Sequence, residues 1–491
     1  MTGNGKRQRE RPRAIVDIGS NTIRMVVYGN PPRAPHILHN EKSVARLGRD
    51  LSRTGKIPDK AAKLALDVLR RFARLIDELQ IEDVEAVATA AVRDAKNGAA
   101  FLDEVRALGF EPRLLSGKQE AQASADGVLG AFPGARGVVA DLGGGSLELR
   151  AIDDEGSDNG TTLPLGTLRL PSLPAKKGKR AAIAKVVSKS GFGAKKGQTL
   201  YLVGGTLRAF GRLAMIEMKS PLEDPHGFVL EIEDARRIAK RLTRRDTDKI
   251  AGIDEISSSR RDMINDASAL VGALLSEFEP DRVVFSAWGL REGLLMQRLP
   301  RELRVQDPLL SGVTDYAARR GVTAHTGAMV AGWIAGLPGA RANGTERLRL
   351  VTAMLALASQ RLEPNIRRRH AYDWALHKRW IGLAPADRAK LAAALLAQTG
   401  RTKLPKELAQ LATKDDLAEG IAWGLAIRLL RRLGSASLSS LVGSMLRLGG
   451  GRLVLVMAPE AMSLCGPGTD DDLAALADHL RLEPAIEQRT A

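Results

Sequence analysis

The chain lacks several features that would place it in a specialised class of protein. Its 491 residues contain a single cysteine, Cys465, which excludes an internal disulfide framework and a multi-cysteine zinc site. Aromatic residues make up only 4% of the chain, which argues against base stacking as its main activity. No apolar run reaches the roughly 18 residues that a membrane-spanning helix needs, and no apolar signal segment follows the basic start. We therefore expect a soluble, cytoplasmic protein without a membrane partner.

Acidic residues are missing from one long stretch, although the chain as a whole carries a net charge of +17. No acidic residue lies between Asp158 and Glu217. The basic residues of this stretch are Arg169, Lys176, Lys177, Lys179, Arg180, Lys185, Lys189, Lys195, Lys196, Arg208 and Arg212. A field of one sign concentrates polyanions near the protein. The alternative is a solvated, lysine-rich loop that serves solubility.

Two short segments of the chain, 15–26 and 139–149, resemble each other. Each is an apolar strand that ends in an aspartate, Asp17 or Asp141, then makes a tight turn and leaves as a second apolar strand. The turn residues are Ser20, Asn21 and Thr22 in the first segment and Gly143, Gly144, Gly145 and Ser146 in the second. Such a turn can direct N–H groups and a hydroxyl at an anion, and the aspartate can hold a cation against it. Either segment alone is equally an ordinary hairpin, but the repetition favours a phosphate site gripped from both sides.

Three further charged residues are candidates for chemistry. Glu120 lies in the first turn of an expected helix, where it can complement the helix dipole or act as a base that deprotonates water. Glu148 shares a hairpin with Asp141, and both carboxylates can reach one Mg²⁺ ion, although Glu148 is equally a solvent-facing strand residue. Arg93 follows a buried strand, where it either clamps a phosphate oxygen or caps the local structure.

The apolar periodicity divides the chain into regions of different type. Strands and helices alternate up to about residue 300, which predicts α/β domains. The main strands are expected over 14–28 as a hairpin, 84–88, 112–115, 199–203 and 281–286, and helices over 58–79, 99–108, 235–242 and 267–278. Alanine and leucine at helical spacing then predict an all-helical region to about residue 434. A strand over 452–457 and a helix over 470–482 complete the chain.

Several motifs occur together in a fixed order. They are DIGSNT over 17–22, LSG over 115–117 followed by Glu120 and Ala121, DLGGGS over 141–146 with Glu148, and GLREG over 289–293. Together they resemble the bacterial exopolyphosphatase and guanosine pentaphosphate phosphohydrolase family over roughly residues 13–305. No single motif is specific, but the ordered set is.

The resemblance implies an α/β fold with two ribonuclease-H-like domains of the actin, sugar-kinase and heat-shock-protein-70 superfamily flanking a cleft. It also implies a following all-helical domain similar to HD phosphohydrolases, and a small C-terminal α/β segment. The expected boundaries are 13–125, 126–305, 306–437 and 438–491. The HD metal motif is absent, since the stretch that begins at Thr352 lacks the expected histidine and no His-Asp pair occurs in the chain.

By the same resemblance Glu120 is the catalytic base, Asp141 and Glu148 lie around a Mg²⁺ site with Asp17 nearby, and Arg93 faces the bound phosphate. The two turns bind phosphate. The expected activity is Mg²⁺-dependent release of terminal phosphate from inorganic polyphosphate by a homodimer. The open alternatives are guanosine pentaphosphate hydrolysis by the same chemistry, a superfamily kinase or ATPase, and a catalytically idle polyanion-binding protein.

Overall fold

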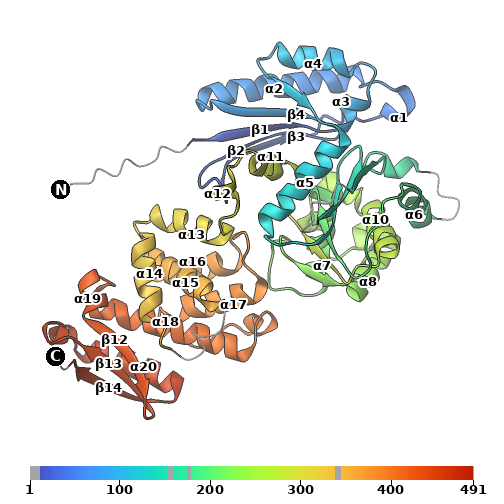
Figure 1. Cartoon of the computed structure of the whole chain (residues 1–491). Helices are drawn as coiled ribbons and strands as arrows, with labels where there is room; N and C mark the ends of the chain where they lie inside the picture. The colour runs from blue at the N-terminus through green and yellow to red at the C-terminus, as the bar shows by residue number, and fades with distance from the viewer. Residues whose placement is uncertain (1–10, 153–158, 174–177, 338–343, 490–491) are drawn as a thin grey trace. The chain divides into compact units, whose positions relative to one another are not determined.

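The computed structural model describes residues 11–152, 159–173, 178–337 and 344–489 (Figure 1). The chain forms two compact units, Met1–Gln306 and Asp307–Ala491. Lys176 and Lys177 of the basic stretch lie outside the described residues. Among the residues described, no helix has the length and apolar character needed to cross a membrane.

The first lobe of the N-terminal unit is built on a five-stranded sheet with the order β3-β2-β1-β4-β5. Its strands are β1 Arg13–Ile18, β2 Ile23–Tyr28, β3 Ile37–Ser43, β4 Asp83–Ala88 and β5 Pro112–Leu114. β1 pairs antiparallel with β2 and parallel with β4, and β5 continues parallel to β4. The alternating residues Ala14, Val16 and Ile18 are fully buried in the core of this lobe, as expected for a strand covered by helices.

The second lobe repeats this arrangement in a six-stranded sheet of order β10-β11-β9-β6-β7-β8. Its strands are β6 Gly137–Leu142, β7 Leu147–Ile152, β8 Gly160–Leu163, β9 Thr199–Val203, β10 Val229–Glu231 and β11 Arg282–Phe285. Read from β8 to β11, the order and the strand directions are those of β3-β2-β1-β4-β5. The β1–β2 and β6–β7 hairpins therefore occupy equivalent places, which explains the repeat in the sequence.

Helices flank the two sheets of this unit. They are α1 Leu51–Thr54, α2 Asp59–Glu78, α3 Ala90–Asp94, α4 Gly98–Arg106, α5 Gly117–Ala131, α6 Lys179–Lys189, α7 Gly205–Glu217, α8 Ile232–Arg244, α9 Ser258–Arg261, α10 Ile264–Phe278, α11 Leu290–Gln297 and α12 Arg301–Arg304. A capping box formed by Ser116 and Gln119 starts α5. α5 packs closely on α11, because a Cβ at Gly293 would clash with the backbone of α5 at Ala123. This contact fixes the helix that carries Glu120.

The C-terminal unit is helical first and mixed afterwards. Its helices are α13 Pro308–Ala318, α14 Ala324–Trp333, α15 Thr345–Ser359, α16 Pro364–Leu376, α17 Pro385–Ala397, α18 Lys414–Gly434, α19 Leu438–Val442 and α20 Pro467–Leu480. A three-stranded sheet of order β12-β13-β14 follows, with β12 Ser444–Gly449, β13 Arg452–Met457 and β14 Glu483–Gln488. Thr352 is fully buried in α15, and its hydroxyl donates to the Leu348 carbonyl 2.8 Å away.

Candidate active site

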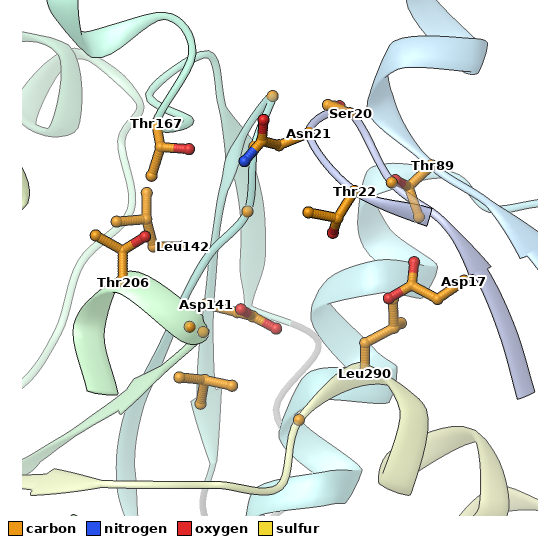
Figure 2. Close-up of a pocket in the computed structure, with 18 of the residues that line it drawn as sticks. Asp17, Ser20, Asn21, Thr22, Thr89, Asp141, Leu142, Thr167, Thr206 and Leu290 are labelled. Carbon is orange, nitrogen blue, oxygen red and sulfur yellow. The ribbon is translucent and has the colours of Figure 1, made fainter. Parts of the chain in front are cut away.

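The two glycine-containing turns, predicted to bind phosphate and termed the phosphate turns below, line a single pocket of about 200 Å³ in the N-terminal unit. Figure 2 shows Asp17 and Asp141 on opposite walls of this pocket, with Asn21 and Thr22 above them. The predicted site residues that line it are Asp17, Ser20, Asn21, Thr22, Glu120, Asp141, Gly143, Gly144, Gly145, Ser146 and Glu148. Arg93 is the predicted residue that is not among the lining residues. The structure therefore assembles the expected constellation, whereas the role of each residue stays a prediction.

The two turns share one backbone geometry and touch each other. The Gly19 N–H donates to the Thr22 carbonyl over 3.0 Å, and the Gly143 N–H donates to the Ser146 carbonyl over the same distance. A Cβ on Gly144 would lie 2.8 Å from the Asn21 backbone nitrogen, so only glycine allows this approach. The result is a cradle made from both lobes, with no bulky side chain between them.

The turns also leave one hydroxyl without a partner. The Ser20 side chain is 3% exposed, and its oxygen has no hydrogen-bond partner in the described structure. A buried polar group of this kind normally finds a partner. A phosphate oxygen in the pocket would supply one.

Three buried carboxylates form the acidic side of the pocket. Burial raises the pKa of Glu120 from its ordinary 4.5 to about 7, against the opposing effect of Arg93. Burial also raises the pKa of Asp141, which Ser124 lowers in part by donating a hydrogen bond. The pKa of Glu148 is raised well above its ordinary value by burial and then by Glu120 and Asp141. One oxygen of Glu148 is buried without a hydrogen-bond partner among the described residues. The protein therefore does not fully compensate the negative charge that Glu120, Asp141 and Glu148 carry when they are ionised.

Two arginines hold carboxylates of the pocket in place. The Arg93 guanidinium donates to Glu120 through Nη1 and to the Leu115 carbonyl over 2.8 Å. Arg93 therefore contacts Glu120 and does not line the pocket. The sequence did not indicate this contact. Arg291 of the GLREG motif lies 2.9 Å from the Asp17 carboxylate. Burial lowers the pKa of Arg291, but Glu292, Tyr28 and Asp17 outweigh burial and raise it, so both arginines stay charged.

Further cations line the pocket that the motifs did not predict. They are Arg24 of β2, Lys42 of β3, Arg208 of α7 and Arg260 of α9. Burial lowers the pKa of Arg24 to about 10, and Arg291 adds to this shift. Burial also lowers the pKa of Lys42, with contributions from Arg260 and Arg24. Within the described residues Arg24, Lys42 and Arg260 form no ion pair, so their positive charges remain available to an anion.

The polyanion path expected of the basic stretch stays a prediction, because the structure places few of its charges at the pocket. Of its described basic residues, only Arg208 lines the pocket. Half of the others pair with carboxylates, in the pairs Arg169–Asp94, Lys179–Asp266, Lys196–Glu279 and Arg212–Glu255. The stretch looks unpaired in the sequence because its acidic partners lie far from it along the chain.

Comparison with known proteins identifies this part of the chain. Residues 26–302, more than half of the chain, match the Ppx/GppA phosphatase family. The chain belongs to this family. The matched segment contains the Asp141 turn, Glu120 and the GLREG motif, while residues 303–491 lie outside it.

Individual proteins also match more than half of the chain. Exopolyphosphatase 1 of Mycobacterium tuberculosis is 26% identical over 303 residues, covering 59% of this chain and 88% of that protein. Retrograde regulation protein 2 of Saccharomyces cerevisiae is 27% identical over 343 residues, covering 62% of this chain and 58% of that protein. The crystal structure of an exopolyphosphatase from Cytophaga hutchinsonii is 23% identical, with a TM-score of 0.51, covering 58% of this chain and 96% of that one. That structural likeness shows the fold alone.

Proposed function

We propose that this Ppx/GppA family member is an exopolyphosphatase, which releases terminal phosphate from inorganic polyphosphate by attack of water. The observation that carries the proposal is the position of Glu120, a buried carboxylate in the same pocket as two facing phosphate turns. A relative named exopolyphosphatase 1 supports the substrate. The repeated sheet order supports assigning the two lobes to the ribonuclease-H-like superfamily.

In this proposal, the turns and the cations bind different parts of the substrate. Backbone N–H groups of the glycine turn and the Ser20 hydroxyl suit the terminal phosphoryl group. Arg24, Lys42 and Arg260 suit the following phosphates, because none of the three forms an ion pair among the described residues and all three line the pocket. A polymer with a charge on every phosphate gains from several such cations at once.

Glu120 is the proposed general base. It would accept a proton from the attacking water, which aligns with the phosphoryl group held by the turns. Positioning contributes much of the acceleration in phosphoryl transfer, and here the turns fix the phosphate while α5 fixes the base.

Asp141 and Glu148 are the proposed ligands of Mg²⁺, with Asp17 facing them. In the parts of the chain that the structure describes, no group of three or more His, Cys, Asp or Glu side chains is arranged to hold a metal ion alone. The residues nevertheless fit Mg²⁺, which takes one or two carboxylates and completes its shell with water and substrate phosphate. The unpartnered oxygen of Glu148 and the raised pKa values of Glu148 and Asp141 mark a site that a divalent cation would stabilise. When bound, the ion would offset charge on the transferred phosphoryl group.

Phosphate release from long-chain polyphosphate and from guanosine pentaphosphate, with Mg²⁺ or with EDTA, tests the proposal. We expect Mg²⁺-dependent release from polyphosphate, with a Michaelis constant that rises at least about tenfold in an R24M/K42M variant because two phosphate-binding charges are lost. A K63M variant, which removes an exposed lysine of α2, is the control. Phosphate release from guanosine pentaphosphate alone would show that the nucleotide, and not polyphosphate, is the substrate. Phosphate release from neither compound would favour a polyanion-binding protein without catalytic activity.

The raised pKa of Glu120 predicts a pH-dependent effect on stability. A carboxyl whose pKa is higher in the folded state than its ordinary 4.5 stabilises the fold while protonated, and this contribution is lost as the pH rises from 4.5 to about 7. In EDTA, an E120Q variant should therefore gain about 1–3 kcal/mol of stability relative to wild type at pH 8, and much less at pH 5. Thermal unfolding of both proteins at the two pH values measures this. An equal difference at both would mean that Glu120 titrates normally.

The C-terminal unit enters the proposal in a coarser form. The helices from α13 to α18 are consistent with an HD-like domain without its metal. Thr352, which begins the stretch where a histidine is expected, is buried and donates a hydrogen bond to the Leu348 carbonyl. The family resemblance also underlies the proposal of a homodimer, and the single cysteine, which suits a reducing compartment, underlies that of a cytoplasmic location. Size-exclusion chromatography with light scattering tests the dimer.

A further inference from the structure

A short segment of the second lobe, residues 165–169, lies over both phosphate turns. The Thr167 N–H donates to the Gly143 carbonyl over 3.0 Å, and the Leu168 N–H donates to the Gly144 carbonyl over 2.9 Å. Gly166 packs so closely on the backbone of Gly145 that a Cβ there would clash. Thr167 lines the pocket and lies near its upper rim in Figure 2. The segment, here termed the strap, is thus fixed to the turn of the second lobe.

The strap also reaches the first lobe at two points. The Leu168 side chain lies 3.4 Å from where a Cβ of Gly48 would be, and Gly48 itself donates to the Ser20 carbonyl over 2.8 Å. At the end of the strap, Arg169 Nη2 lies 2.7 Å from Asp94 Oδ2 at the end of α3. The strap therefore joins the two lobes beside the site.

A chain of charged contacts continues from the strap to Glu120. Asp94 uses its second oxygen, Oδ1, to face Arg93 Nε at 3.5 Å. Arg93 in turn donates from Nη1 to Glu120 and to the Leu115 carbonyl. The guanidinium is rigid and planar, so a partner on Nε restricts the direction in which Nη1 points. Arg93 and Arg169 each expose 23% of their side chains, which shields these contacts in part from solvent.

We propose that Asp94 and Arg169 are positioning residues, which align the Glu120 carboxylate through Arg93. The Arg169–Asp94 ion pair joins the strap to α3 and holds Asp94 beside Arg93. The base is thereby aligned for attack on a substrate that both lobes grip. This inference rests on the proposed function, because it assigns Glu120 the role of base.

Steady-state kinetics of phosphate release from polyphosphate test the proposal. R169M and D94N should each lower kcat by roughly 10- to 100-fold and change KM by less than about threefold, because the turns still bind phosphate while the base is misaligned. R169K should recover most of kcat, since one ammonium can replace the single 2.7 Å contact. The double variant should be about as active as D94N, because D94N alone already breaks both the Arg169–Asp94 and the Asp94–Arg93 contacts.

An ion pair elsewhere in the unit supplies the control. Arg298 pairs with Asp83 over 2.5 Å, is more exposed than Arg169, and lies outside the pocket lining, so R298M should keep wild-type kcat. Thermal unfolding should move by no more than about 3 °C for all of these variants, since part-exposed ion pairs stabilise little. Retention of kcat within about twofold in R169M and D94N would overturn the proposal, as would additive losses in the double variant. A wild-type protein that releases no phosphate from polyphosphate would instead overturn the proposed function, and this inference with it.

Discussion

Replacing Glu120 with glutamine is expected to lower kcat for phosphate release by a factor of about 10²–10⁴, the usual contribution of a general base. The amide keeps the size of the side chain but cannot accept the proton of the attacking water. Binding of polyphosphate should persist, because the turns and the unpaired cations that hold the substrate are unchanged. The measurement is kcat from steady-state phosphate release, together with direct binding of polyphosphate to the variant.

An E111Q variant is the matched control for this change. Glu111 is exposed in the first lobe and precedes β5, outside the residues that line the pocket. Its replacement should leave kcat and KM unaltered. If E120Q retained more than about a tenth of the wild-type kcat, the base would have to be another group, and the buried Glu148 would be the first to replace.

Adding a single methyl group between the two turns should also lower the catalytic efficiency kcat/KM strongly. In Gly144→Ala the new Cβ would lie 2.8 Å from the Asn21 nitrogen and 2.9 Å from the Asn21 Cβ, so the turns must move apart. Because displacement by about 1 Å can cost a factor of roughly 100 in rate, we expect kcat/KM to fall by about that factor. Phosphate release and thermal unfolding measure the two consequences.

Gly193→Ala is the control for the added methyl group. A Cβ at Gly193 has no neighbour within 4 Å, and the residue is exposed, so activity and Tm should be unaffected. A Gly144→Ala protein with normal kinetic constants would mean that the two turns do not need to touch in order to bind phosphate.

The sequence predicts the parts of this fold whose signal is local. The strands over 199–203 and 452–457 are found at those bounds as β9 and β13, since each is a continuous apolar run. The helix over 58–79 is found as α2 Asp59–Glu78, which buries one apolar face. β3 escaped prediction because its sequence, ILHNEKS, is polar and largely exposed. Edge strands of this kind carry little hydrophobic pattern.

The site residues that belong to the repeated turn could be predicted from the sequence. Asp17, Asp141 and the glycines could be read from the repeat. Arg24 and Lys42 could not, because Lys42 lies near Arg260 of α9, and Arg24 near Arg291 of α11, only in the folded unit. The pairing of Lys179 with Asp266 was hidden for the same reason, since 87 positions separate them.

The repeated hairpins also differ at one telling position. In the register of β1 with β2, Asp17 faces Arg24, whereas in the register of β6 with β7, Asp141 faces Glu148. Two identical hairpins would present the same charges to an anion from both sides of the pocket. The exchange of a cation for a carboxylate breaks that equivalence, so a proposed phosphate-binding charge lies on one hairpin and a proposed metal ligand lies at the same place on the other. A chain molecule in the pocket therefore meets opposite charges at equivalent positions of the two hairpins.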